Sequence, residues 1–177
     1  MSILTLFKIA LSLPIAYGLA YPFIHSTNSA PVGGILGEIS VFGPTISVVV
    51  VSVFLLLVVL YARDLAKCLR LVSPEARAAS PNSVWWMLVL PYNFIEDFFI
   101  MINIAKSLQT EALSNRALAQ FTSFGKFSGL AWCACQIISL LPNEVGSLFG
   151  LIAIVFWGWH WAFIRRANRA MLEFKPA

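Results

Sequence analysis

The chain has 177 residues, of which 59% are hydrophobic and only 11% are charged, and its mean hydropathy is +0.83. Soluble globular domains hold about 45 to 50% apolar and about 25% charged residues, so this composition excludes an ordinary soluble domain and indicates an integral membrane protein. The formal charge of +4 accompanies apolar segments, not a basic stripe with exposed aromatic residues, which argues against nucleic-acid binding. No polar stretch is long enough to bury a core of its own, so we expect one membrane domain over residues 1–177.

The first two membrane spans are expected at residues 4–23 and 43–62. Each has about the 20 apolar residues that cross ~30 Å of hydrocarbon. Lys8 ahead of an apolar run also resembles a secretory signal peptide, but we expect a retained span. Between the two spans, residues 25–45 are rich in glycine and contain no Lys or Arg, which predicts a loop.

A basic segment follows the second span. Its sequence Ser73-Pro74-Glu75 is typical of a helix start, with Ser as the N-cap, Pro at the first helical position and Glu favoured by the helix dipole. This pattern predicts a short interfacial helix. The basic residues that surround it are Arg63, Lys67, Arg70 and Arg77.

The segment at residues 84–108 begins like a membrane helix but meets Pro91, Tyr92 and Asn93 after a few apolar residues. It then places Glu96 and Asp97 side by side. Carboxylates in the middle of a membrane cost about 2.5 to 3.5 kcal/mol each on insertion scales. We therefore expect this segment to enter the bilayer and turn back, as a re-entrant or interfacial broken helix.

The last two spans are expected at residues 125–141 and 145–164, joined by a tight turn at residues 142–144. Small residues recur on both at nearly four-residue spacing, which permits close helix contact. This spacing predicts a tight hairpin that supports the broken segment. The small residues are Gly125, Gly129 and Cys133 on one helix and Gly146, Gly150 and Ala153 on the other.

The distribution of basic residues selects the topology, because cytoplasmic flanks of membrane helices carry the excess of Lys and Arg. Five complete crossings would place seven of the twelve basic residues outside. If residues 84–108 turn back, all twelve lie at or near the cytoplasmic face. The predicted fold is thus an all-α membrane protein with four transmembrane helices, one re-entrant segment and both termini in the cytoplasm.

The middle of the chain resembles the central motif of a group of small bacterial multi-pass membrane proteins of unknown function. That motif runs Ser-Pro-Glu-x-Arg, then Val-Trp, a Leu, a Pro and an Asn, then paired Phe and Ile-Ala-x-Ser-Leu. The positions that match are Arg70, Ser73, Pro74, Glu75, Arg77, Pro81, Val84, Trp85, Leu88, Pro91, Asn93, Phe98, Phe99, Ile104, Ala105, Ser107, Leu108 and Glu111. The chain departs from the group at Glu96 and Asp97, where the group has apolar residues or Trp. The resemblance implies a bacterial inner membrane protein whose middle segment is a unit, and it implies no activity.

Residue sets typical of enzymes and metal sites are missing from the sequence. It shows no Ser/His/Asp set, phosphate loop or metal-ligand spacing, so we expect no catalytic residues, no metal and no enzyme activity. Cys133 and Cys135 lie about 200° apart on a helix and cannot easily share a metal. With Cys68 they are interpreted as structural thiols.

Two histidines raise the possibility of haem, because bis-His ligation in a helix bundle is familiar. His25 and His160 are expected near opposite membrane faces, too far apart for one iron, so His160 is interpreted as an interfacial residue in an aromatic belt. With Trp157 and Trp161 it is also a weak candidate for binding a lipid, a quinone or a pigment. We expect no cofactor; bound lipids are expected, and haem, quinone and pigment stay open.

Glu96 and Asp97 are the main candidates for function, since ionisable groups at membrane depth are functional candidates by default. Three roles are open: a proton or cation relay, contact with a partner subunit, or extension to the headgroups beside Lys106. Asn93 and Asn103 join them as candidates, because both lie on the polar face of the same helix.

The favoured hypothesis is a non-catalytic membrane subunit or assembly component of a larger complex, whose partners are other integral membrane proteins or further copies of the chain. A small oligomeric channel or proton/cation transporter that uses Glu96 and Asp97 is the alternative. Binding of a lipid, quinone or pigment near the Trp/His cluster is the third.

Overall fold

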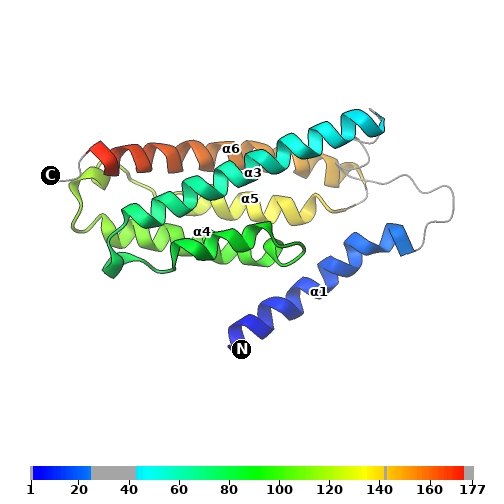
Figure 1. Cartoon of the computed structure of the whole chain (residues 1–177), viewed down its shortest axis with the longest axis horizontal. Coiled ribbons are helices and arrows are strands. Elements are labelled where there is room, and N and C mark those ends of the chain that lie inside the picture. Colours follow the sequence, from blue (N-terminus) through cyan, green and yellow to red (C-terminus); the bar gives the residue numbers. More distant parts are fainter. Residues whose placement is uncertain (1, 25–42, 142, 174–177) are drawn as a thin grey trace.

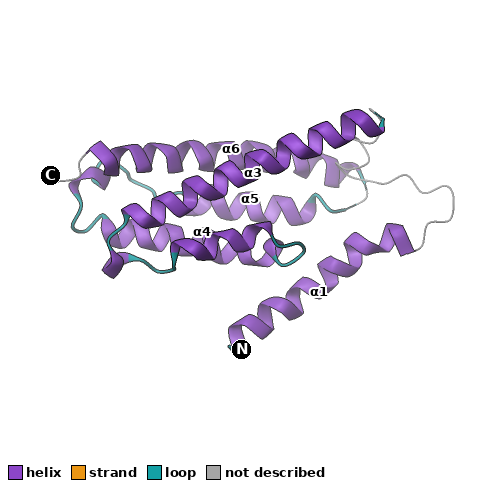
Figure 2. Cartoon of the chain, in the orientation of Figure 1, coloured by secondary structure: helices purple, strands orange, loops and turns teal. Residues whose placement is uncertain are grey.

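The computed structural model describes residues 2–24, 43–141 and 143–173. Within these ranges every regular element is a helix, which confirms the all-α prediction for this part of the chain (Figure 2). In chain order the elements are α1 (Ile3–Ile24), α3 (Pro44–Leu71), the 3₁₀-helices η1 (Pro74–Ala76) and η2 (Pro81–Leu88), α4 (Asn93–Glu111), the 3₁₀-helix η3 (Arg116–Leu118), α5 (Lys126–Ile138) and α6 (Glu144–Glu173). Helices α3 to α6 form a bundle, from which α1 diverges (Figure 1).

Among the described residues, two helices are long and apolar enough to cross a membrane, namely α3 and α6. In α1 the apolar stretch Ile3–Tyr17 is shorter. Helix α5 has 13 residues, so at 1.5 Å per residue it is about 20 Å long, less than the ~30 Å of a hydrocarbon core. The structure thus shows two of the four predicted spans by length and composition, and the span predicted at 125–141 is shortened to α5.

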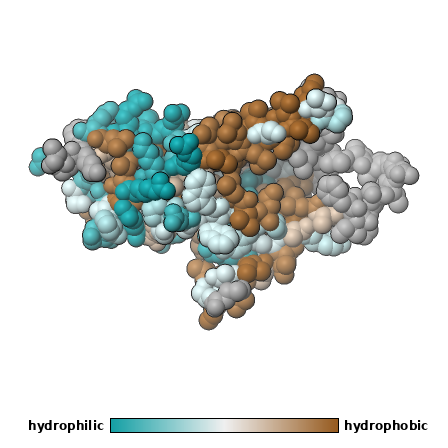
Figure 3. Space-filling model, in the orientation of Figure 1, coloured by the Kyte–Doolittle hydropathy of each residue, from teal (hydrophilic) through white to brown (hydrophobic). Residues whose placement is uncertain are grey.

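Both long helices continue beyond the predicted spans. Helix α3 was expected to end near residue 62 but runs on to Leu71, because its last turns are amphipathic: Leu65 and Leu69 are buried, whereas Arg63 and Lys67 are exposed. Helix α6 likewise passes residue 164 and buries Met171. As a result the molecule has a hydrophobic end and a hydrophilic end (Figure 3).

The broken segment reverses the direction of the chain. η2 leads to a turn with a cis Leu90–Pro91 bond, and α4 then runs back alongside η2 (Figure 1). The reversal that the sequence predicts within residues 84–108 is therefore present. The apolar residues from Val84 onward, which resemble the start of a membrane helix, belong to the 3₁₀-helix η2, which begins at Pro81 and buries Val84.

The predicted helix start at Ser73 produces only the single turn η1. Ser73 stands at the N-cap position, but its hydroxyl donates to Oε2 of Glu111 at 2.7 Å, and its backbone N–H donates to the same oxygen at 2.9 Å. The serine therefore ties η1 to the end of α4 and does not cap a longer interfacial helix. A second tie joins these regions, since the Ala78 N–H donates to the Ser107 hydroxyl at 2.9 Å.

Tyr61 of α3 lies fully buried at the centre of the bundle. Its ring makes edge-on contacts with Trp132 of α5 and Trp157 of α6, at centroid distances of 5.6 and 5.8 Å. Edge-to-face pairs at such distances stabilise a core beyond the area that they bury. One aromatic residue thus connects three helices.

The predicted α5–α6 hairpin is present, because α5 packs more extensively against α6 than against any other element described. The small residues predicted for this hairpin do not all lie at the contact between α5 and α6. A Cβ atom at Gly125 would lie 2.7 Å from Cδ1 of Phe163 in α6, whereas one at Gly129 would lie 2.9 Å from the side chain of Met101 in α4. Gly129 therefore brings α5 close to α4, not to α6 as predicted.

Gly125 offers a test of this packing. Its φ of 72° lies in the left-handed region, so Gly125→Ala combines backbone strain with the clash against Phe163. We expect a loss of stability of about 1 to 3 kcal/mol, measured as thermal unfolding in detergent. The control Gly158→Ala, where no atom lies within 4 Å, should gain about 0.5 to 1 kcal/mol. Equal melting temperatures for the two variants would contradict the assigned geometry.

Candidate functional site

Helix α1 is attached to the bundle at Lys8. The Nζ of Lys8 lies 2.6 Å from Oε2 of Glu96, and the two side chains are only 11% and 9% exposed. The ammonium also lies 4.0 Å from the ring centroid of Phe99, a distance at which a cation is attracted to the face of an aromatic ring. Both of these contacts are with α4, so a buried ion pair fixes where α1 meets α4.

The partner of Glu96 is therefore a lysine of the same chain. The sequence interpretation had treated Lys8 only as a flank of the first span. The sequence does contain an indication of this pair, because a Lys and a Glu in two apolar segments are each costly at membrane depth and tend to pair. Extension of these carboxylates toward Lys106, one of the three roles that the sequence leaves open, is not seen, since Glu96 and Asp97 are both buried.

Asp97 is 1% exposed, and its Oδ1 has no hydrogen-bond partner among the described residues. This burial places the carboxyl group inside the bundle. Asn93 is buried one turn earlier, and its Oδ1 is likewise without a partner.

Asn103, the fourth predicted contact residue, lies apart from this group. It is half-buried, and its backbone carbonyl accepts from the Ser107 hydroxyl at 2.7 Å. The structure thus brings together Asn93, Glu96 and Asp97 at the start of α4.

The residues of the Trp/His cluster lie together around Tyr61, whose ring centroid is 6.0 Å from that of His160 and 5.8 Å from that of Trp161. His160 is 1% exposed and its Nδ1 lies 2.7 Å from the Tyr61 hydroxyl, so its assignment to an interfacial belt is wrong. Trp157 is buried beside it. The ring centroid of Trp161 lies 5.4 Å from that of Trp157, and its Nε1–H donates to Oδ2 of Asp64 at 2.6 Å, at the edge of a groove. The other histidine of the haem hypothesis, at position 25, lies outside the described residues.

Glu111 is the centre of a polar cluster at the hydrophilic end. Besides the two bonds from Ser73, its Oε1 accepts from Nδ2 of Asn115 at 2.9 Å. Partial burial raises the pKa of Glu111, but the hydrogen bonds from Asn115 and Ser73 and the charge of Arg77 outweigh it, so the pKa lies below its usual value. The cluster fastens η1 and the turn after α4 in their folded positions.

Within the described ranges, no group of three or more His, Cys, Asp or Glu side chains is placed to hold a metal ion. The three cysteines are free thiols, and each of them is buried.

No protein-family model, curated protein or solved structure matches the chain. The resemblance of the middle segment to a group of bacterial membrane proteins therefore stays an expectation, and the function has to be argued from the geometry.

The ion pair can be tested by removing its members singly and together. Lys8→Met or Glu96→Leu leaves a buried group without its partner, which typically costs about 3 to 5 kcal/mol for a charge. The double variant Lys8→Met, Glu96→Leu removes both charges and should lose much less, since apolar replacement of a buried pair is often close to neutral. Thermal unfolding in detergent measures all three variants, and additive losses would show that the two side chains do not interact.

The Glu111 cluster predicts a pH dependence of stability. Because the folded-state pKa is lowered, the carboxylate stabilises the fold above its unfolded pKa of about 4.3, and this contribution is lost as the pH falls through the folded value. Glu111→Gln should therefore melt well below the wild type at pH 7 and approach it below pH ~4. The exposed neighbour variant Glu75→Gln serves as the control and should follow the wild type at every pH. A constant difference between Glu111→Gln and the wild type would contradict the assignment.

Proposed function

We propose that the chain is a non-catalytic integral membrane subunit, or an assembly component, of a larger membrane protein complex. The observation that carries this proposal is the attachment of α1. This helix of 22 residues meets the bundle at α4 through a buried ion pair and diverges from α3 (Figure 1).

The surface of α1 supports the proposal. Association of helices in a membrane depends on close packing and polar contacts, because lipid tails are as apolar as Leu side chains. Beyond its contact with α4, α1 exposes large apolar side chains along its length, among them Leu6, Phe7 and Leu13. A helix with so little packing against its own chain presents a surface that fits a transmembrane helix of a partner.

In this proposal the chain crosses a bacterial inner membrane four times, with α1, α3, α5 and α6. The separation of the hydrophobic end from the hydrophilic end supports this arrangement (Figure 3). So does the position of Arg63, Lys67 and Arg70, which follow the apolar half of α3, because the cytoplasmic flanks of membrane helices are rich in Lys and Arg. Both termini and both ends of the η2–α4 hairpin then lie on the cytoplasmic side.

A second candidate function, proton or cation transport, is favoured by Asp97, which is buried with one oxygen lacking a partner. Glu96 argues against it, since Lys8 already neutralises that carboxylate. The two candidates differ in what the purified protein does alone: only a transporter dissipates a proton or cation gradient in liposomes, and Asp97→Asn would abolish that activity.

The subunit proposal is tested by photo-crosslinking in intact cells. A photoreactive amino acid at Leu6 of α1 should form an adduct with another membrane protein, whereas one at Leu151 of α6 should not, although the two side chains are similarly exposed at 53% and 57%. Purification without crosslinking should recover the same partner, and Lys8→Met should release it while the exposed-site control Lys106→Met retains it. A protein that purifies alone, forms no adduct and dissipates a gradient would overturn the proposal in favour of transport.

A further inference from the structure

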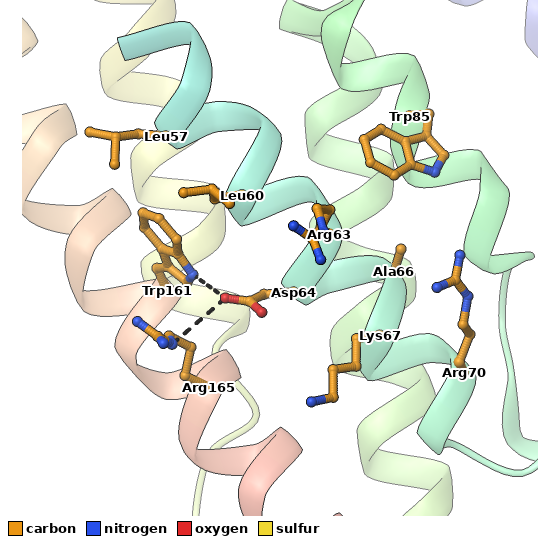
Figure 4. A pocket seen from close by; sticks show the side chains of 10 residues that line it. All are labelled: Leu57, Leu60, Arg63, Asp64, Ala66, Lys67, Arg70, Trp85, Trp161 and Arg165. Atoms are coloured by element: carbon orange, nitrogen blue, oxygen red, sulfur yellow. Dashed lines mark hydrogen bonds and ion pairs between the residues drawn. The ribbon is translucent and has the colours of Figure 1, made fainter. Parts of the chain in front are cut away.

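A groove of about 840 Å³ opens between α3, η2 and α6, away from the Lys8–Glu96 pair. Leu57 and Leu60 form one part of its wall, and Arg63, Lys67 and Arg70 continue the wall along α3 (Figure 4). Trp85 of η2 adds an aromatic ring to the lining. The wall thus changes from apolar to cationic along one helix.

The positive charge of the groove is not neutralised by its own carboxylate. Asp64 is the acidic residue of the lining. Its Oδ2 accepts from Nε1–H of Trp161 at 2.6 Å and lies 3.7 Å from Nε of Arg165 (Figure 4). Over residues 2–24, 43–141 and 143–173, no ion pair is formed by Arg63, Lys67 or Arg70. These three side chains are exposed and spaced by four and three residues, so they share one face of α3.

The groove also lies at the level where the surface of the molecule changes character. Exposed apolar side chains predominate in α3 before Leu57, including Phe54, Leu55 and Leu56, whereas exposed basic residues follow from Arg63 onward. Trp side chains are enriched at this depth in membrane proteins, and Trp85 lies there beside the basic face. A ligand of the groove would meet hydrocarbon at one end and aqueous headgroups at the other.

We propose that this groove binds the headgroup of an anionic phospholipid of the cytoplasmic leaflet. The phosphate lies against Arg63, Lys67 and Arg70, and the first part of an acyl chain lies against Leu57 and Leu60. Basic pockets between membrane helices on the cytoplasmic side hold anionic headgroups in this way. The apolar wall selects a lipid over a soluble phosphate, which would leave Leu57 and Leu60 unused. The site shares no residue with the α1–α4 contact, whereas its place in the cytoplasmic leaflet rests on the topology proposed above.

The test uses the full-length chain in a neutral detergent, titrated with phosphatidylglycerol and with phosphatidylcholine of the same acyl chains. Native mass spectrometry counts the lipids bound. We expect phosphatidylglycerol to bind more tightly, and Arg63→Gln with Lys67→Gln to weaken it about 10- to 30-fold, since each basic residue near the headgroups contributes about a fivefold gain in affinity. Arg70→Gln alone should weaken binding about fivefold.

The matched control is Arg166→Gln with Arg169→Gln, which removes the same charge from exposed positions of α6 outside the groove and should leave the affinity unchanged. An equal loss in this control would overturn the proposal, because the attraction would then follow net charge alone. Equal affinity of the wild type for both lipids would overturn it as well. Displacement of phosphatidylglycerol by an equal concentration of inorganic phosphate would assign the groove to a soluble anion and reject the lipid.

Discussion

The position of α1 depends on the buried ion pair between Lys8 and Glu96. Inside an apolar environment neither charge is tolerated alone, so the two side chains hold each other at a fixed point along their helices. Ser12 is also buried, but its hydroxyl donates to the Lys8 carbonyl within α1, so this hydrogen bond does not join α1 to α4. The first turn of α4 is therefore where α1, the broken segment and the bundle meet.

The broken segment is held from its other end by polar contacts. Glu111 binds the chain at Ser73, and Ser107 binds it at Ala78, so the reversal between η2 and α4 is closed on the hydrophilic side of the molecule. Backbone that leaves helical geometry at membrane depth has to be packed in protein. Here the buried side chains of Val84 and Met87 pack η2 against the bundle. The segment is thus supported both by polar bonds and by apolar packing.

The helices and the break between them were largely predictable from composition and local pattern. Runs of apolar residues indicate the helices, and Pro91 predicts the reversal by its position. Contacts between residues that are distant in sequence were harder to predict. That Lys8 meets Glu96, 88 residues away, and that His160 meets Tyr61, 99 residues away, depends on how the helices pack. The sequence identified Glu96 as a candidate, but only tertiary packing supplied its counter-ion.

Helix ends were predicted least well, for a physical reason. The hydropathy of a span falls where the membrane ends, but helical geometry continues as long as one face stays buried, as it does at Leu69 and Met171. Ser73 shows the opposite case. Its local pattern is that of a helix start, yet its hydroxyl donates to the Glu111 carboxylate and accepts no backbone N–H as a helix cap would.

The short α5 gives the molecule an uneven hydrophobic thickness. The apolar length of α3 matches the hydrocarbon thickness of a normal bilayer, whereas the 13 residues of α5 extend only about 20 Å. In the proposed four-span arrangement, lipids that border α5 would have to thin locally, at a cost of fractions of a kcal/mol for each ångström of mismatch. A neighbouring protein with an equally short apolar segment would remove this deformation, so mismatch alone directs such a neighbour toward α5.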